Sequence, residues 1–441
     1  MSTSLRQLLA RAGYSLLLRT AVPLYRLRLL WRGRREPLYA TAIGERFGRY
    51  RESLAPGALW MHAVSLGETR AMAPLVDALR AARPGVRFVF THGTATGRAA
   101  GEALLQSGDR QVWLPWDTPG AVRRFLRSAQ PIAGVLMETE IWPNLLAAAA
   151  REGVAVVLAN ARLSERSRRR GARVDALLRP AFASLAAALA QTDADAARLR
   201  DAGARDVSVV GNLKYDLAPD PELLARGRGW RDGVARGIVV AASTREGEEP
   251  ELLAAWRATA APRPLLVIVP RHPQRFGSVA ELVANAGFTL SRRSAWHGDV
   301  RARDASDCDV WLGDSMLEMP AWYALGDVAL LGGSFAPLGG QNLIEAAACG
   351  CPLVLGPHTF NFSDAAELAI AAGAAVRVDD IVAGVAAAVA LASPAQAPER
   401  ARRSQAALAF TGAHRGAAAR MAARILDVAD RGARRVPRSA G

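Results

Sequence analysis

The chain has almost no lysine. Of its 56 basic residues, 55 are arginine, and the one lysine is Lys214, in Gly211-Asn212-Leu213-Lys214-Tyr215-Asp216. A lysine kept against such a bias indicates a position that needs a compact point charge, which a planar guanidinium does not imitate. Chance survival of a single lysine is the alternative interpretation. We predict that Lys214 binds or stabilises an anion in an active site.

Cysteine and histidine are also scarce, with three and six residues. The three cysteines, Cys308, Cys349 and Cys351, cannot form a disulfide framework, and we interpret them as small buried apolar residues in a reducing compartment. The histidines are scattered without metal-ligand spacing. We therefore expect neither a metal site nor a metal cofactor.

Long apolar runs are absent from the N-terminal segment, where none approaches the ~18 residues of a spanning helix. Residues 1–51 carry eleven arginines against two acids, which gives +9 of the chain's +15. Leucines interleave with arginines over 1–35, which favours an amphipathic segment on an anionic membrane surface. A helix packed on the protein's own body is one alternative. A nucleic-acid-binding arm is another, but no known reader motif is present, so we expect no nucleic-acid partner.

The apolar runs that do occur are short and alternate with helical patterns. Continuous apolar strands of this kind are typical of parallel sheets covered on both faces. Two such sets predict an α/β chain with two doubly wound, Rossmann-like domains facing a cleft, with ligands at the carboxyl ends of the strands. The expected strands are 58–64, 86–91, 111–115, 132–138, 154–160, 185–191, 206–210, 237–242, 264–269, 309–313, 327–332, 352–356 and 375–378.

A stretch rich in proline, glycine and arginine separates the two sets of strands. We divide the chain into a membrane-associating segment 1–35, an N-terminal Rossmann-like domain 36–216, a linker 217–236 and a C-terminal Rossmann-like domain 237–441. The last helix of the second domain could pack back on the first.

Candidate acid–base residues follow strands of the first half. Glu68 stands at a helix start in Ser65-Leu66-Gly67-Glu68-Thr69. It could be a general base in a partly buried site, or Ser65 and Glu68 could form only a capping box. Glu138 and Glu140, two residues apart at a strand end, suit acid–base or sugar-hydroxyl contacts, with helix capping as the alternative. Arg162 follows the next strand and could orient a carboxylate.

The second half carries candidate phosphate contacts. Pro270 and Pro273 would rigidify the turn that presents Arg271 or His272, and an arginine there suits a phosphate. A glycine-rich loop at 332–340 feeds a helix that begins near Asn342 and carries Glu345. Free backbone N–H groups and the helix dipole predict a phosphate site. Carboxylates in one half and a phosphate site in the other suit a nucleotide-sugar glycosyltransferase.

At these motifs the chain closely resembles the 3-deoxy-D-manno-octulosonic acid (Kdo) transferases of lipopolysaccharide assembly. The resemblance covers about residues 20–425, and several motifs match in order. The matching segments are 44–48, 62–69, 137–144, 160–164, 211–216, 269–273 and 356–362.

The resemblance implies a GT-B fold and inverting transfer of Kdo from CMP-Kdo to a lipid A precursor, lipid IVA. It also implies a location at the cytoplasmic face of the bacterial inner membrane. By match to the family's motifs, Glu68 would be the general base, and Glu138 and Lys214 would stabilise the transition state. The family often has a glycine at the position of Leu317. The implied CMP-binding residues are Pro270, Arg271, Met316, Leu317, Glu318, Asn342, Leu343, Ile344 and Glu345.

Three other functions compete with this one. The first is another GT-B enzyme, such as a nucleotide-sugar epimerase or a transferase with a different donor. The second is a non-catalytic scaffold on a membrane surface, and the third is a nucleic-acid binder. Strict dependence on CMP-Kdo would distinguish the first alternative from the function that the resemblance implies.

Overall fold

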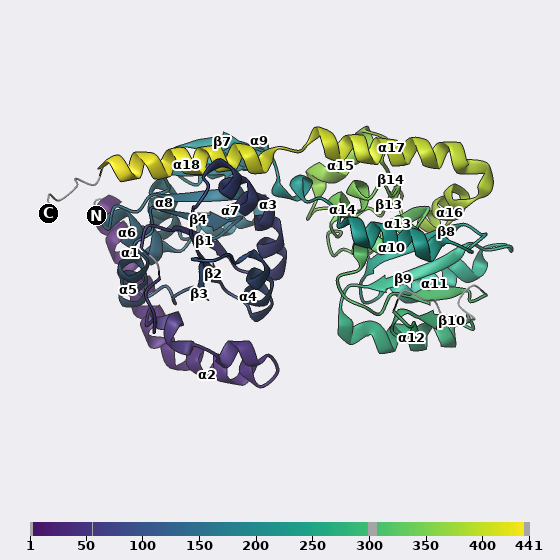
Figure 1. Cartoon of the computed structure of the whole chain (residues 1–441), viewed down its shortest axis with the longest axis horizontal. Helices are drawn as coiled ribbons and strands as arrows, with labels where there is room; N and C mark the ends of the chain where they lie inside the picture. The colour runs from purple at the N-terminus through teal and green to yellow at the C-terminus, as the bar shows by residue number, and fades with distance from the viewer. Residues whose placement is uncertain (1–2, 55, 299–306, 436–441) are drawn as a thin grey trace. The chain divides into compact units, whose positions relative to one another are not determined.

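The apolar runs form two parallel sheets of seven strands each (Figure 1). The structure is a computed structural model that describes residues 3–54, 56–298 and 307–435. The first sheet has the order β3-β2-β1-β4-β5-β6-β7, and its neighbouring strands pair in parallel. Its strands are β1 Leu59–Ala63, β2 Phe88–His92, β3 Arg110–Trp113, β4 Ala133–Met137, β5 Val156–Ala161, β6 Ala187–Ala190 and β7 Val207–Val209.

The second sheet has the order β10-β11-β9-β8-β12-β13-β14, again with parallel neighbours. Each expected strand is present, which confirms the prediction of two doubly wound sheets, and edge strand β10 was not predicted. The strands are β8 Ile238–Thr244, β9 Leu265–Pro270, β10 Leu290–Arg292, β11 Val310–Leu312, β12 Val328–Leu331, β13 Leu353–Leu355 and β14 Ala375–Arg377.

Helices connect the strands of each sheet. Those in the first half are α1 Thr3–Thr20, α2 Val22–Gly33, α3 Leu66–Ala82, α4 Ala95–Gly101, α5 Pro119–Ala129, α6 Pro143–Arg151, α7 Glu165–Ala172, α8 Asp175–Ala183 and α9 Asp193–Asp201. Those that follow are α10 Pro221–Arg231, α11 Glu248–Ala258, α12 Phe276–Asn285, α13 Met319–Leu325, α14 Leu343–Ala348, α15 Ser363–Ala371, α16 Ile381–Ala392, α17 Ala397–Ala413 and α18 Ala417–Arg435.

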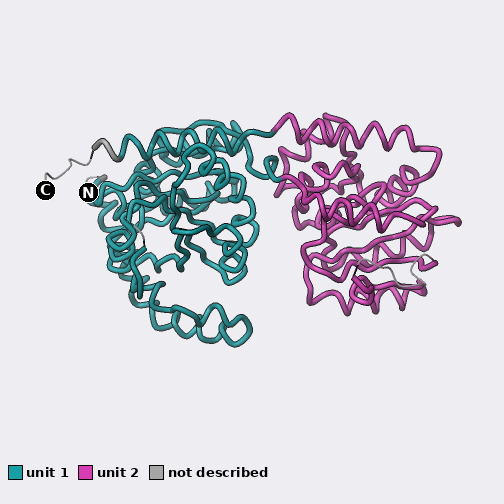
Figure 2. Tube along the Cα trace, viewed as in Figure 1, with its two compact units in different colours: residues 1–217, 415–441 teal, residues 218–414 magenta. Residues whose placement is uncertain are grey.

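The chain divides into unit 1, residues 1–217 and 415–441, and unit 2, residues 218–414 (Figure 2). These limits differ from the predicted domains at two places. The predicted linker 217–236 contains α10, whose Trp230 is buried against Trp322 of α13 with ring centroids 4.7 Å apart. The apolar side chain of Trp230 makes this segment part of unit 2, although its proline, glycine and arginine content resembles a linker.

The last helix, α18, belongs to unit 1. Its Met421 and Ile425 are fully buried in the same cluster as Met61 of β1. The carboxylate of Asp216 accepts hydrogen bonds from the backbone N–H groups of Gly416 and Ala418, at 2.5 and 2.6 Å. A carboxylate at a helix N-terminus satisfies unpaired donors and the helix dipole. The segment that holds Lys214 therefore also fixes the start of α18.

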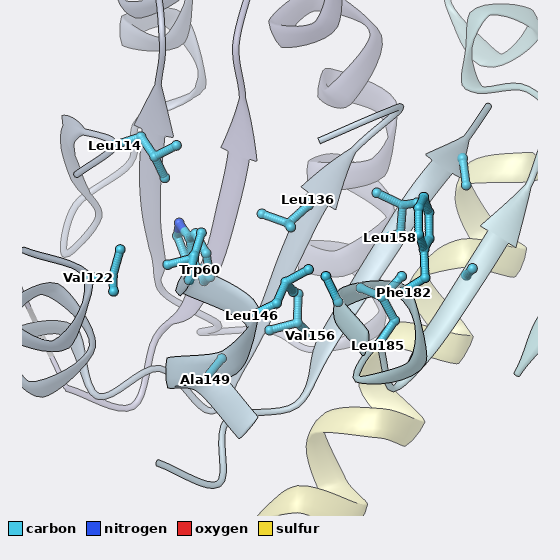
Figure 3. Close-up of a cluster of buried hydrophobic side chains, with 14 of the residues drawn as sticks. Trp60, Leu114, Val122, Leu136, Leu146, Ala149, Val156, Leu158, Phe182 and Leu185 are labelled. Carbon is cyan, nitrogen blue, oxygen red and sulfur yellow. The ribbon is translucent and has the colours of Figure 1, made fainter. Parts of the chain in front are cut away.

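A second cluster fills the opposite face of the unit 1 sheet, beneath α5, α6 and α8. Trp60, Leu136 and Leu158 point from the strands, while Leu146 of α6 and Phe182 of α8 cover them (Figure 3). Burial on both faces fixes the positions of the strands' carboxyl ends, where the candidate catalytic residues lie.

The N-terminal segment packs on unit 1 through one side. The Tyr14 hydroxyl donates to Asp117 at 3.0 Å, the Ser15 hydroxyl donates to Asn144 at 3.0 Å, and the Tyr25 ring stacks on Trp116. The same segment leaves large apolar side chains between 45% and 71% exposed: Leu5, Leu8, Leu9, Leu16, Leu17, Leu24, Leu27, Leu30 and Trp31. Packing on the body and an exposed apolar face are both present.

In the described part of the chain, no single helix is long and apolar enough to cross a membrane. One pair, Ile381–Ala392 with Pro394–Gly432, meets the criteria together and is bent by 77°.

Two glycines of α10 give a matched test of its packing. A Cβ at Gly227 would overlap the carbonyl oxygen of Ala321 in α13, whereas a Cβ at Gly229 meets nothing within 4 Å. Both substitutions to alanine gain about 0.5–1 kcal/mol of helix propensity. We expect Gly227→Ala to lower the free energy of unfolding by about 1–3 kcal/mol from overpacking, and Gly229→Ala to raise it. Urea denaturation measures both; equal effects would contradict the packing of α10 against α13.

Candidate active site

Glu68 lies in the first turn of α3, directly after β1. The Val64 N–H donates to its Oε2 at 2.8 Å and the Ser65 hydroxyl donates to its Oε1 at 2.9 Å. The Glu68 N–H in turn donates to Ser65 Oγ at 3.4 Å, so the capping interaction is present. Burial raises the pKa of Glu68 against these hydrogen bonds, and the Glu138 carboxylate adds to the rise. The carboxylate thus combines a capping role with an increased affinity for a proton.

Two residues at the ends of neighbouring strands have left-handed backbones. Glu138 follows β4 with φ +57°, and Asn160 in β5 has φ +51°. Such conformations cost on the order of 1–3 kcal/mol outside glycine and persist where the surroundings enforce them. The Glu138 N–H donates to the Ala159 carbonyl, and the Arg162 N–H donates to the Glu138 carbonyl. These bonds hold the Glu138 turn against β5.

Lys214 lies in a 3-10 turn, Leu213–Asp216, that two asparagines position. The Leu213 N–H donates to Asn160 Oδ1 at 3.1 Å, and the Lys214 N–H donates to Asn212 Oδ1 at 3.0 Å. Burial lowers the pKa of Lys214, while Glu138 and Glu68 raise it. The positioning role of Asn160 was missed, because only the shared edge of a folded sheet places it beside a segment 53 residues away.

Glu140 adds a third carboxylate to this edge. Its Oε2 lies 3.9 Å from Nε2 of His62, a fully buried ring whose Nδ1 is 3.0 Å from the Thr91 carbonyl oxygen. Burial lowers the pKa of His62 to about 3, so the ring is neutral. Burial also raises the pKa of Glu140 to about 7, with a further contribution from the Glu68 carboxylate. Glu140 can therefore hold a proton near neutral pH.

The structure thus brings Glu68, Glu138 and Lys214 together at the carboxyl edge of the unit 1 sheet. The charges of Lys214 and Glu138 act on the pKa of Glu68, and the charges of Glu138 and Glu68 act on the pKa of Lys214. Arg162 belongs to the same group, because its charge lowers the pKa of Lys214. Among the described residues, no group of three or more histidine, cysteine, aspartate or glutamate side chains is arranged to hold a metal ion.

In unit 2, Pro270 ends β9 and Arg271 follows it as an exposed residue. The Arg271 N–H donates to the Thr244 carbonyl at 3.0 Å. Burial raises the pKa of Tyr323 well above its ordinary value; Glu345 adds to this rise and Arg271 opposes it. The predicted residues Arg271 and Glu345 therefore lie around one buried phenol.

In segment 316–318, the carboxylate of Glu318 is already bound by other side chains of unit 2. Leu317 has φ +71°, a conformation that glycine adopts more readily than leucine, and the residue is 56% exposed. The Glu318 carboxylate accepts hydrogen bonds from Arg293 at 2.8 and 3.0 Å and from Arg226 at 3.3 Å. Because these arginines occupy the carboxylate, a ligand here would meet backbone groups and the exposed side chains of Met316 and Leu317.

The glycine-rich loop differs from the prediction of free N–H groups. The buried carboxylate of Glu248 accepts hydrogen bonds from the N–H groups of Gly333, Phe335 and Ala336, at 2.8, 3.2 and 3.2 Å. An internal acid occupies this part of the predicted phosphate site. The sequence could not reveal this, because Glu248 lies 85 residues from Gly333. Arg245, which directly follows β8, was not predicted as a neighbour of this loop. A Cβ built on Gly333 would lie 3.6 Å from the Cγ of Arg245, so the two residues are adjacent.

The start of α14 remains as the candidate anion contact. The side chains of Leu343 and Ile344 are fully buried, so these two residues could reach a ligand only through their backbone. Asn342 precedes the helix, and its Oδ1 is buried without a hydrogen-bond partner among the described residues. A buried acceptor left unpaired costs about 1–3 kcal/mol, which a ligand donor would recover.

The raised pKa of Glu140 predicts how stability changes with pH. Its folded-state pKa of about 7 lies above the ordinary 4.5, so the native state holds the proton more tightly and loses stability as pH rises from about 4.5 to 7. Glu140→Gln removes this loss. We expect its stability relative to wild type to be about 2 kcal/mol more favourable at pH 8 than at pH 5. Urea denaturation at both pH values, with exposed Glu102→Gln as control, measures this; a pH-independent difference would contradict it.

The chain is similar in sequence to known proteins over most of its length. The family model for 3-deoxy-D-manno-octulosonic-acid transferase (kdotransferase) matches residues 41–217. The chain is 47% identical to the 3-deoxy-D-manno-octulosonic acid transferase of Bordetella pertussis over 93% of this chain and 98% of that relative. It is 35% identical to that of Haemophilus influenzae over 75% of this chain and 78% of that relative.

A solved structure supports the fold alone. UDP-GlcNAc 2-epimerase from Neisseria meningitidis, bound to UDP-GlcNAc, matches with a TM-score of 0.56 and 12% identity, over 85% of this chain and 100% of that chain. Likeness at this identity carries the GT-B architecture and no activity. With the relatives above, it follows that the chain belongs to the Kdo transferase family and is a GT-B glycosyltransferase of lipopolysaccharide biosynthesis.

Proposed function

We propose that the chain transfers Kdo from CMP-Kdo to a lipid A precursor, lipid IVA, with inversion at the anomeric carbon and with Glu68 as general base. The observation that carries the proposal is the position of Glu68: a partly buried carboxylate at a helix start, with a raised pKa, interacting with Glu138 and Lys214. A base needs a pKa near the working pH, and burial moves Glu68 in that direction.

In the proposed step, Glu68 accepts the proton of an acceptor hydroxyl. The hydroxyl oxygen forms a bond to the anomeric carbon of Kdo from the face opposite the phosphate. The bond from that carbon to the phosphate oxygen breaks, and its electron pair leaves with CMP. Positive charge fixed near the developing charge lowers the barrier, because the site needs no reorganisation during the reaction.

Lys214 and Arg271 are the cations that we assign to this role. Burial lowers the pKa of Lys214, and the Glu138 carboxylate opposes this lowering and so favours the charged ammonium. An ammonium is a compact charge, whereas a guanidinium is planar and binds a phosphate through two donors. Because these side chains supply the positive charge, the proposal includes no metal cofactor.

Unit 2 supplies the proposed donor contacts. Arg271 and the start of α14 would contact the phosphate, the backbone of 316–318 and the Asn342 Oδ1 would contact the rest of CMP, and Glu345 would accept ribose hydroxyls. Support comes from the unpaired Asn342 acceptor and from Leu317, which has a left-handed backbone and is 56% exposed.

We further propose that the enzyme lies at the cytoplasmic face of the bacterial inner membrane, beside its lipid acceptor. The exposed apolar side chains of α1 and α2 alternate with arginines, as in helices that lie in a membrane interface. Arginines attract anionic lipids, and the acceptor's own phosphates are anionic.

The direct test is a mass spectrum of the acceptor after incubation with the purified chain, CMP-Kdo and EDTA. We expect wild type to add one or more Kdo units. Glu68→Gln should lower the rate by about 1000-fold through loss of the base, while CMP binding persists because its proposed contacts lie in unit 2. Glu102→Gln is the matched control. An unmodified acceptor with wild type overturns the proposal, and loss of CMP binding in Glu68→Gln would assign Glu68 a structural role.

Lys214→Arg tests the requirement for a compact charge. The substitution keeps the charge but places a planar group in a partly buried site, and misplacement of a catalytic charge by about 1 Å costs on the order of 100-fold in rate. We expect a loss of that order in kcat with little change in the free energy of unfolding. Arg228→Lys, at an exposed position, is the reciprocal control. Near-normal turnover of Lys214→Arg would contradict the assigned role.

A further inference from the structure

A groove of about 490 Å³ lies on unit 1, away from the residues assigned to catalysis. Three helices form it: α1, α5 and α6. Its lining combines basic and apolar side chains, which are Leu8, Leu9, Arg11, Ala12, Ser15, Pro119, Arg123, Arg127, Asn144, Ala147, Ala148, Arg151 and Glu152.

The charges of the groove favour an anion. Four arginines converge from three helices, against the single acid Glu152. Arg127 lies 3.6 Å from Glu152, and within the described residues the other three arginines pair with no carboxylate. Burial lowers the pKa of Arg11, and the charge of Arg151 lowers it further. Because like charges held together repel, a phosphate that accepts hydrogen bonds from them would stabilise the groove.

The apolar part of the lining favours an acyl chain beside that phosphate. Leu8 and Leu9 are each 54% exposed, and Ala147 and Ala148 of α6 line the same groove. A free anion such as inorganic phosphate would leave these side chains in water. An anionic amphiphile would cover them and would gain about 25 cal/mol for each Å² of apolar surface removed from water.

The groove is built by specific contacts. The Ser15 hydroxyl of α1 donates to the side chain of Asn144, which lines the groove, and the Tyr14 hydroxyl donates to Asp117. The Asp117 carboxylate also accepts hydrogen bonds from the N–H groups of Asn144 and Leu145 at the start of α6. The same contacts that seat α1 therefore set the distance between its Arg11 and Arg151 of α6.

The position of the arginines separates the groove from the acceptor chemistry. Helix α6 starts at Pro143, shortly after Glu138 and Glu140, and ends at Arg151. Nine helical residues span about 13 Å, so Arg151 lies at the end of α6 away from the catalytic edge.

We propose that this groove binds an anionic membrane phospholipid, with its headgroup phosphate between Arg11 and Arg151 and its acyl chain along Leu8, Leu9 and Ala148. The inference rests on the membrane location proposed above and on neither the donor nor the acceptor. A bound phospholipid would fix α1 at the membrane surface while its exposed leucines enter the interface.

The test is native mass spectrometry of the full chain in detergent, titrated with phosphatidylglycerol in the absence of CMP-Kdo. We expect one phosphatidylglycerol to be retained by wild type. Arg11→Gln/Arg151→Gln should weaken this binding about tenfold or more, because two charge-assisted hydrogen-bonding groups are lost. The matched control, Arg19→Gln/Arg28→Gln, removes two arginines of the same segment outside the groove and should bind within twofold of wild type. Thermal unfolding checks that both variants are folded.

Further ligands in the same assay decide the source of the phosphate. Phosphatidylcholine and inorganic phosphate should bind at least tenfold more weakly than phosphatidylglycerol. Equal binding by the two double variants overturns the proposal, as does equal binding of inorganic phosphate, which would indicate a site for a soluble anion. Preferential retention of lipid IVA would assign the groove to the acceptor and overturn it as well. Kdo transfer is measured separately, so failure of either proposal leaves the other testable.

Discussion

The candidate site of unit 1 depends on the repulsion among three carboxylates and on the positive charge of Lys214, which offsets that repulsion. Glu68, Glu138 and Glu140 stand at one edge of one sheet, and burial raises the pKa of Glu68 and Glu140. Without a cation, such a cluster would protonate or separate. Lys214 opposes the rise of the Glu68 pKa, and Glu138 opposes the lowering of the Lys214 pKa by burial. The left-handed turn at Glu138 and the hydrogen bond from Leu213 to Asn160 fix this balance in space.

In unit 2, a buried carboxylate binds backbone N–H groups that could otherwise bind a ligand anion. A glycine-rich loop that follows a strand presents several N–H groups, and a ligand phosphate often binds them. Here Glu248 occupies those of Gly333, Phe335 and Ala336. The loop is therefore ordered without a bound ligand, and the donor contacts that we propose are Arg271, the backbone of 316–318 and the start of α14. A preordered loop lowers the entropy lost when a ligand binds.

The sequence predicts the sheets well because buried parallel strands are continuous apolar runs, and such runs need no tertiary information to be recognised. The edge strand β10, Leu290–Arg292, was missed because Leu290 is its one apolar residue, so no apolar run marks it. The predicted linker concealed α10, whose packing depends on Trp230 meeting Trp322 of a distant helix. Among the site residues, those directly after strands could be predicted, but the partners Asn160 and Glu248 act across 53 and 85 residues and could not.

The contacts of α1 join the N-terminal segment to the sheet edge that carries the candidate catalytic residues. Asn144 accepts the Ser15 hydrogen bond through its side chain and donates its N–H to Asp117, and it stands in the first turn of α6. The residues just before that turn include Glu138 and Glu140. A shift of α1 would break the Ser15 contact and release one constraint on the start of α6. The order of the loop that carries Glu138 and Glu140 therefore depends in part on the position of α1. The groove arginines lie on these same helices, and an anion that holds α1 against α6 would stabilise the loop through packing alone.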